Sequence, residues 1–135
     1  LQDRRGAQRS WEVTEVNEML TQMESFSGVF VASTNLMSNL DQAALRRFDL
    51  KVKLDFLGPN QTSELLRRYC LSIKILEPSL AELAKATRLH NLTPGDFAAV
   101  MRQSRFRPFG SCIDLVSALA SESALKENSR TSIGF

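Results

Sequence analysis

The sequence contains no apolar run long enough to cross a bilayer, and no signal-peptide pattern opens it. Its one histidine, His90, has no partner at metal-ligand spacing, so we predict no metal site. Cysteine is scarce, because Cys70 and Cys112 are the only two. Both lie in helical patterns, so we interpret them as small buried residues in a reducing cytosol, with a disulfide as the alternative. These absences predict a cytoplasmic protein with no membrane span.

The charge of the chain is nearly balanced, with 17 Lys and Arg against 15 Asp and Glu. A net charge of +2 is too small to indicate nucleic acid or an anionic membrane as a partner. The content of 43% hydrophobic residues is typical of a folded chain. A length of 135 residues suits one compact domain or two small subdomains. Because the first residue is Leu1 and not Met, we expect a piece of a longer protein.

Two segments have the pattern of β-strands. Val29–Ala32 is apolar throughout, as in a strand buried on both faces. In Leu50–Phe56 the apolar residues alternate with Lys51, Lys53 and Asp55, as in a strand with one solvated face. Together with the helical patterns around them, these segments predict an α/β fold.

Between these strands lie residues suited to phosphate chemistry. Ser33-Thr34-Asn35 follows the first strand, and open α/β sheets place ligands at such carboxyl ends. Asp41–Leu45 predicts a short helical turn leading to Arg46 and Arg47, whose guanidinium groups can bond phosphate oxygens in a bidentate way. Alternatively, Asn35 is a turn-forming residue and the arginines are a surface pair bound to carboxylates.

The segment before the first strand divides into a polar part and a helical part. Gln2–Ser10 is Arg-rich, contains one glycine and predicts a solvated loop. Trp11–Phe26 predicts a helix with Ser10 as its N-cap, ended by Ser27-Gly28. Its methionines are interpreted as core filler. The apolar residues at helical spacing are Val13, Val16, Met19, Leu20 and Met23.

After the second strand the pattern is helical throughout, and Leu57-Gly58-Pro59 is the best boundary between the two parts. Four helix starts are predicted from proline and capping patterns. They lie at Pro59, Pro78, Thr93-Pro94-Gly95-Asp96 and Ser111. The expected apolar faces comprise Leu65, Leu66, Tyr69, Cys70, Leu80, Leu83, Ala84, Phe97, Val100, Met101, Ile113, Val116, Leu119 and Ala120. The polar tail from Lys126 has no assignment.

These residues resemble the C-terminal part of an AAA-type ATPase core. The order strand, S-T-N, L-D-x-A-x-L-R-R-F, strand resembles the second half of its sheet, and VNEMLTQMESFSGVFVASTN resembles the helix that leads into its sensor strand. The resemblance implies that residues 1–56 are the C-terminal part of the AAA+ P-loop ATPase α/β subdomain. Residues 57–135 would then form the four-helix lid.

The resemblance implies roles for individual residues. Asn35 is at the sensor-1 position, where a neutral amide would orient a water beside the γ-phosphate. Arg46 and Arg47 lie in the arginine-finger region and would act in trans on ATP of a neighbouring subunit. Most members separate these arginines by Pro-Gly, so which one reaches the phosphate stays open. Pro94 and Gly95 match the lid turn that touches adenosine, with a glycine merely tolerated in a first helical turn as the alternative.

The Arg-rich N-terminal segment matches the second pore loop of AAA hexamers. On that interpretation Arg5, Gly6 and Arg9 would face a threaded protein substrate. The alternative is a solvated connector.

The motifs that hold phosphate and Mg²⁺ are absent from the sequence. It has no G-x-x-x-x-G-K-[ST] and no apolar strand ending in Asp-Glu. We therefore predict that this chain binds no cofactor and is inactive alone. The whole protein would be an ATPase using ATP and Mg²⁺ to remodel protein substrates, as a ring that we expect to be a hexamer.

Two other classes of function compete with this interpretation. The main alternative is a non-catalytic protein-interaction module of degenerate AAA ancestry. A nucleic-acid binder using Arg102, Arg105 and Arg107 is disfavoured by the small net charge and the lack of a basic stripe.

Overall fold

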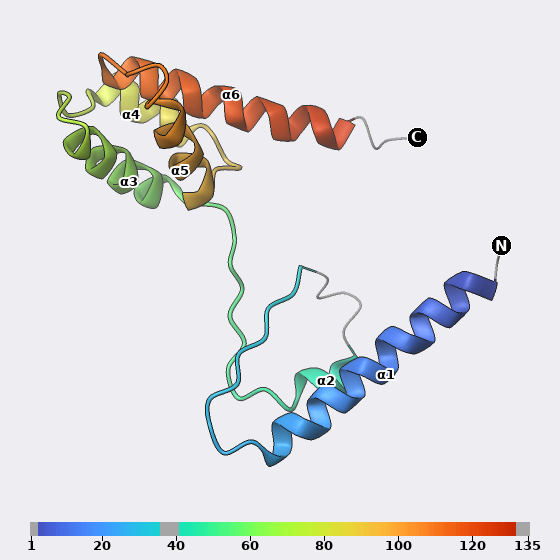
Figure 1. Ribbon diagram of the computed structural model, residues 1–135. Coiled ribbons are helices and arrows are strands. Elements are labelled where there is room, and N and C mark those ends of the chain that lie inside the picture. Colours follow the sequence, from blue (N-terminus) through green and yellow to red (C-terminus); the bar gives the residue numbers. More distant parts are fainter. Residues whose placement is uncertain (1–2, 36–40, 132–135) are drawn as a thin grey trace. The chain divides into compact units, whose positions relative to one another are not determined.

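The computed structural model describes residues 3–35 and 41–131. Contacts divide the chain into two compact units, Leu1–Lys53 and Leu54–Phe135, which we call unit 1 and unit 2. The helices in the described residues are α1 (Asp3–Ser25), α2 (Gln42–Leu45), α3 (Pro59–Ser72), α4 (Leu80–Thr87), α5 (Pro94–Gln103) and α6 (Cys112–Thr131) (Figure 1).

The two predicted strands are not formed, and the described residues contain no strand at all. The predicted α/β sheet is therefore not confirmed in the described residues, which are mostly helical. A strand is held by backbone hydrogen bonds to a neighbouring strand, and a lone pair of strands is marginal in water. Over residues 3–35 and 41–131, Val29–Ala32 and Leu50–Phe56 have no third strand to join, and no backbone hydrogen bond pairs them with each other.

Helix α1 is longer than predicted, because it begins at Asp3. The predicted loop Gln2–Ser10 is therefore wrong over its helical residues, which are mostly good helix formers apart from Gly6. Ser10 is not an N-cap; it lies within the helix, where its carbonyl accepts a hydrogen bond from the Thr14 hydroxyl at 2.9 Å. The side chains of Arg5 and Arg9, predicted to face a substrate, lie outside the described part of the structure.

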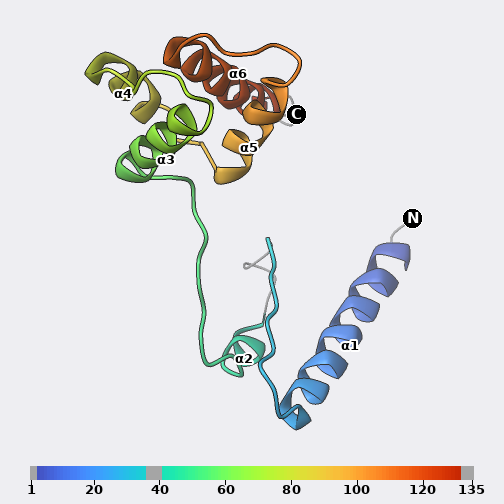
Figure 2. The same ribbon diagram turned by 60° about the vertical axis from the view of Figure 1, so that its left-hand side comes forward.

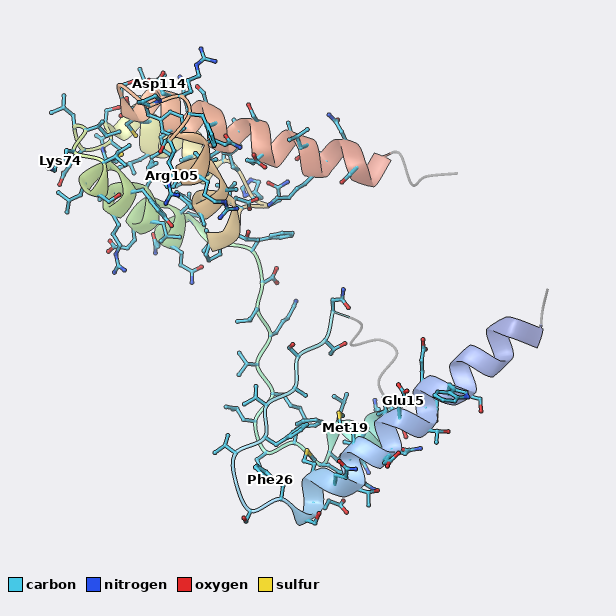
Figure 3. All side chains as sticks on the ribbon, in the orientation of Figure 1. Glu15, Met19, Phe26, Lys74, Arg105 and Asp114 are labelled. Carbon is cyan, nitrogen blue, oxygen red and sulfur yellow. The ribbon has the colours of Figure 1, made fainter. Side chains whose placement is uncertain are left out.

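The apolar face of α1 is only partly covered. Leu20 is buried, with 2% of its surface exposed, whereas Met19 is 37% exposed and Val13 is 60% exposed. The prediction that the methionines fill a core is therefore wrong for Met19, which Figure 3 labels together with Phe26. The physical reason is that no sheet lies in the described part of unit 1 to cover this face of the helix.

The predicted helical turn before the arginines is confirmed as α2. Asp41 is its N-cap, and its carboxylate accepts a hydrogen bond from the Ala43 backbone at 3.2 Å. Phe48 follows the arginines and is half-buried, with its ring centroid 6.4 Å from that of Phe30. This aromatic contact connects the arginine segment to the segment that precedes Asn35.

Unit 2 is a helical bundle, and its four predicted helices are confirmed. Helix α3 packs on α4, while α4 and α5 both pack on α6 (Figures 1 and 2). The prediction of a buried position is wrong for Leu80, Ala84 and Ile113, which are exposed, Leu80 at 86% and Ile113 at 57%. The buried core consists of Leu66, Cys70, Ala86, Leu92, Phe97, Val100, Cys112, Leu115, Val116 and Leu119.

Two helix starts follow the predicted capping chemistry, and one does not. Pro59 begins α3 after the N-cap Gly58, and Thr93 caps α5 as predicted. Pro78 does not open a helix, because Ser79 is the N-cap of α4 and forms a capping box with Glu82. Helix α6 continues past Lys126 to Thr131. Part of the tail for which no structure was predicted is therefore helical.

Candidate functional site

The two arginines at the end of α2 differ in their surroundings. Arg46 is the C-cap of α2, is exposed, and makes no ion pair within the described residues. The Nη1 atom of Arg47 lies 3.2 Å from Oε1 of Glu24 on α1, with 43% and 58% of the two side chains exposed. An exposed pair of this kind is worth about 0–1 kcal/mol, so it orients Arg47 without holding it firmly.

Asn35 is exposed at the end of the apolar segment, immediately before residues 36–40, which lie outside the described part. No hydrogen bond joins its side chain to Arg46 or Arg47 in the described structure. Leu40, the first residue of the L-D-x-A-x-L-R-R-F motif, also lies outside the described residues. Pro94 and Gly95 belong to unit 2, whereas Asn35, Arg46 and Arg47 belong to unit 1.

The turn Thr93–Asp96 at the start of α5 is tightly organised. The Asp96 carboxylate accepts hydrogen bonds from the Thr93 backbone N–H at 2.7 Å and from its hydroxyl at 2.8 Å. In return the Thr93 hydroxyl accepts from the Asp96 backbone N–H at 3.3 Å. This capping box surrounds Pro94 and Gly95, both of which are exposed.

We expect Gly95→Ala to raise the free energy of unfolding of unit 2 by about 0.5–1 kcal/mol, because alanine has the lower entropy cost in a helix. Gly95 does not adopt a positive φ, and an added Cβ would meet nothing closer than the Thr93 hydroxyl, at 3.5 Å. Urea denaturation followed by circular dichroism would measure the change. A loss of stability would show that the turn itself requires glycine.

Sequence reasoning missed Lys126 as a partner of this turn. Lys126 on α6 donates hydrogen bonds from Nζ to the Asp96 carboxylate and to the Asn91 backbone carbonyl. Its ammonium also lies 5.7 Å from the centroid of the Phe56 ring. The sequence held no signal for this contact, because 30 residues separate Lys126 from Asp96 and only the packing of α5 on α6 joins them.

The charge of Asp96 is maintained although only 10% of its side chain is exposed. Burial by itself would raise the pKa of this carboxyl, but hydrogen bonds from Lys126 and Thr93 outweigh burial and lower the pKa below its usual value. The ionised carboxylate is therefore the form that the folded state stabilises.

The stability of unit 2 should accordingly fall in acid. A carboxyl with a lowered folded pKa stabilises the fold above its unfolded pKa of about 3.9, and this contribution is lost as the pH falls through the folded value. We expect Asp96→Asn to cost about 1–3 kcal/mol at neutral pH and to remove this part of the pH dependence. Urea titrations between pH 6 and pH 3 would test it. Equal acid sensitivity in both proteins would contradict the assignment.

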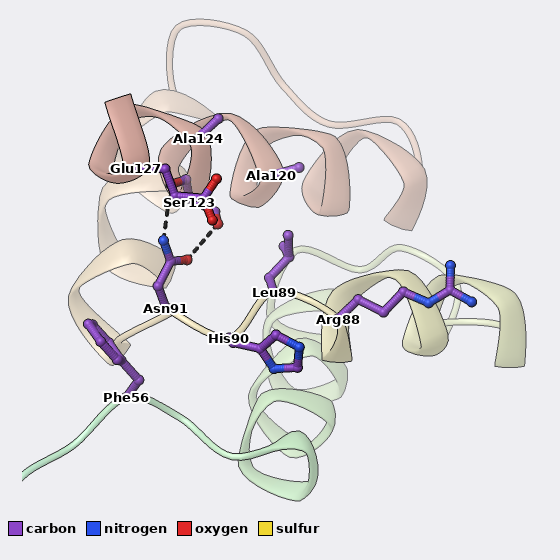
Figure 4. Close-up of a pocket in the computed structure, with 9 residues that line it drawn as sticks. All are labelled: Phe56, Arg88, Leu89, His90, Asn91, Ala120, Ser123, Ala124 and Glu127. Atoms are coloured by element: carbon purple, nitrogen blue, oxygen red, sulfur yellow. Dashed lines mark hydrogen bonds between the residues drawn. The ribbon is translucent and has the colours of Figure 1, made fainter. Parts of the chain in front are cut away.

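A shallow pocket of about 450 Å³ lies between the α4–α5 connection and α6 (Figure 4). Asn91 and Ser123 on its wall are occupied with each other, since the Asn91 amide donates to the Ser123 carbonyl at 3.1 Å and the Ser123 hydroxyl donates to the Asn91 side chain. Figure 4 shows Arg88 extending away from Phe56. The charged and aromatic groups therefore do not converge, and none of the predicted site residues lines this pocket.

Other kinds of site find little support in the described residues. They contain no cluster of three or more side chains suited to hold a metal ion.

Cys70 and Cys112 are free and buried, which agrees with the first interpretation of these cysteines. Burial, followed by a hydrogen bond with Cys70, raises the pKa of the Cys112 thiol to about 12, so this thiol is no nucleophile at neutral pH. No described helix is both long and apolar enough to traverse a membrane.

One known protein family matches the segment that contains the two arginines. Residues 1–56 match the family model described as the ATPase family associated with various cellular activities (AAA). This match supports an AAA-family identity for the segment. The AAA match ends at Phe56, so it includes Asn35, Arg46 and Arg47, while the helices from Pro59 onward lie outside it. No curated protein and no solved structure was found to match the chain.

AAA ATPases in general use ATP and Mg²⁺ and usually form oligomers. The family match therefore supports the predicted class of protein. It says nothing of the individual roles of the arginines or of unit 2.

Proposed function

We propose that this chain is the C-terminal part of an AAA ATPase core, with Asn35 as sensor 1 and the Arg46-Arg47 pair as its trans arginine finger. The observation that carries the proposal is the AAA match over residues 1–56. The chain itself has no phosphate-binding loop, so the proposal assigns ATP and Mg²⁺ binding to the complete protein.

Within the pair, we assign the finger to Arg46. Its exposed side chain has no carboxylate partner in the described residues, and the capped turn of α2 presents it. Arg47 would instead orient the segment through Glu24, 3.2 Å away. A guanidinium free of competing carboxylates keeps its donors for the phosphoryl oxygens of a neighbouring subunit.

Unit 2 is assigned the role of the helical lid, with Pro94 and Gly95 at the nucleotide. The support is the open approach to the α5 turn, where an added Cβ at Gly95 would meet nothing closer than 3.5 Å. Glycine there leaves the backbone N–H groups of a helix start accessible to a ligand. The domain division for this role is 1–56 and 57–135.

In the complete protein, ATP hydrolysis would drive remodelling of protein substrates by a ring, which we expect to be a hexamer. The two reduced thiols suit the cytosol. The second candidate is a non-catalytic interaction module of degenerate AAA ancestry, and it is favoured by the exposed apolar side chains of unit 1, such as Val29 at 90% and Val31 at 83%.

Isothermal titration calorimetry would compare ATP binding by this chain with ATP binding by the complete protein. We expect this chain to bind ATP·Mg²⁺ negligibly, because nothing in its sequence cradles the β- and γ-phosphates. The complete protein should bind ATP·Mg²⁺ and hydrolyse it. A micromolar dissociation constant for the chain alone would overturn the first expectation, and a complete protein without ATPase activity would favour the interaction module.

A further inference from the structure

Lys126 makes three separate contacts inside unit 2. Its ammonium donates to the Asp96 carboxylate, donates to the Asn91 carbonyl, and lies over the Phe56 ring at 5.7 Å from the centroid. Only 32% of the lysine side chain is exposed. Each contact reaches a different part of unit 2, namely the start of α5, the connection before it, and the first residues of the unit.

The chain enters unit 2 directly beside these contacts. The backbone N–H of Leu57 donates to the Leu92 carbonyl at 2.8 Å, which attaches the entry segment to the connection between α4 and α5. Leu92 is fully buried, and Asn91 and Thr93, its neighbours, take part in the hydrogen bonds of Lys126 and Asp96. The donor of this bond therefore directly follows Phe56 in the chain, and its acceptor Leu92 directly precedes Thr93, the N-cap of α5.

Asn91 is itself attached to α6. Its side chain exchanges hydrogen bonds with the hydroxyl and the carbonyl of Ser123, one turn before Lys126. The connection between α4 and α5 is thus held to α6 at two successive turns. A hydrogen bond that involves a charged group is stronger than a neutral one, so we expect Lys126 to contribute the larger share.

We propose that Lys126 is a positioning residue that joins the entry segment Phe56-Leu57 and the α5 turn Thr93–Asp96 into one rigid body. The two segments are distant in sequence, and without the ammonium they would lose the charged contacts that connect both of them to α6. If Gly95 touches the nucleotide, a movement of that turn would be transmitted directly to Phe56-Leu57, at the start of unit 2. This last consequence rests on the proposed function, whereas the joining does not.

Hydrogen exchange of the 135-residue chain tests the joining without any nucleotide. In Lys126→Met, which keeps most of the side-chain length but removes the charge, the Leu57 amide should exchange at least about tenfold faster. The amide of Ile75, which donates to the Cys70 carbonyl at 3.1 Å at the end of α3, should change by less than about twofold. Lys126→Arg should restore the slow exchange of Leu57. Lys85→Met, at an exposed lysine of α4, is the matched control and should leave both amides unchanged.

Phe56→Leu provides a second variant in case Lys126→Met does not fold. It removes only the aromatic ring, so the Leu57 amide should exchange about two- to fivefold faster, with Ile75 unchanged. Equal acceleration of Leu57 and Ile75 would show general destabilisation and overturn the proposal, as would unchanged exchange of Leu57 in Lys126→Met. Absence of ATPase activity in the complete protein would bear on the proposed function alone.

Discussion

In sedimentation equilibrium at high micromolar concentration, the chain should form oligomers and not a clean monomer. Unit 2 should fold natively, since its ten core residues are buried among four helices. The segments predicted as strands form no strand in the described residues, and most of their apolar side chains are exposed. Apolar segments of this kind tend to pair with other chains.

The driving force can be estimated from the exposed side chains. Each valine or leucine gains about 1.5–3 kcal/mol when it is fully buried, so a few of them outweigh the cost of association. Lys51 and Lys53 discourage edge pairing by the second segment, but the first segment carries no charge of this kind. The exposed fractions are 90% for Val29, 83% for Val31, 79% for Leu50, 69% for Val52 and 91% for Leu54.

A pair of variants locates the self-association. The double substitution Val29→Lys and Val31→Lys should shift the chain towards monomer, because it places charge on the first segment. Leu71→Lys is the matched control, since Leu71 is 74% exposed on α3 in unit 2, and it should leave the distribution unchanged. A monomeric parent chain with amide protection throughout Val29–Ala32 would show this account to be mistaken.

In the complete protein, Arg46→Ala should lower ATP turnover by on the order of 10³-fold or more while changing ATP affinity little. Trans arginine fingers stabilise charge that develops in the transition state, and they are worth about 10³–10⁵ in rate where they are measured in GTPases. Arg47→Ala should also lower turnover, by a smaller factor, because its role here is to orient the segment through Glu24. Steady-state kinetics together with ATP titration would separate kcat from binding.

Arg67→Ala is a matched control, because Arg67 is an exposed arginine on α3 and should leave turnover unchanged. Mixing Arg46→Ala subunits with subunits that bind ATP but cannot hydrolyse it should partly restore activity, since some interfaces then combine an intact finger with an intact cradle. Loss of ATP binding with unchanged turnover per bound nucleotide would reject the finger assignment. A larger effect of Arg47→Ala than of Arg46→Ala would exchange the two roles.

Local signals in the sequence determined most of the helices. The helical turn after Asp41, the cap at Thr93 and the proline at Pro59 appear where predicted, because these features depend on residues within one turn of each other. The helix start predicted at Pro78 is wrong, because Ser79 forms a capping box with Glu82 and begins the helix one residue later. The polar, Arg-rich start of α1 is helical and not the predicted loop, because most of its residues are good helix formers.

Contacts between distant segments could not be predicted in the same way. A strand pattern states only that a segment is able to pair, and Val29–Ala32 and Leu50–Phe56 find no partner in the described part of the chain. Which side of a helix is covered likewise depends on its neighbours, so Leu80 is exposed at 86% although it fits the apolar stripe of its helix.

The sequence by itself determined the positions of the arginine pair, of the α5 turn and of four helices, because these features follow from residue type and short spacing. The AAA match over residues 1–56 supports the class of protein that the arginine segment indicated. Only the tertiary structure decided that Glu24 lies beside Arg47 and that Lys126 reaches Asp96, Asn91 and Phe56. The physical reason is that charged side chains find distant partners only after helix packing has placed them within hydrogen-bond reach, and spacing along the chain carries no record of that packing.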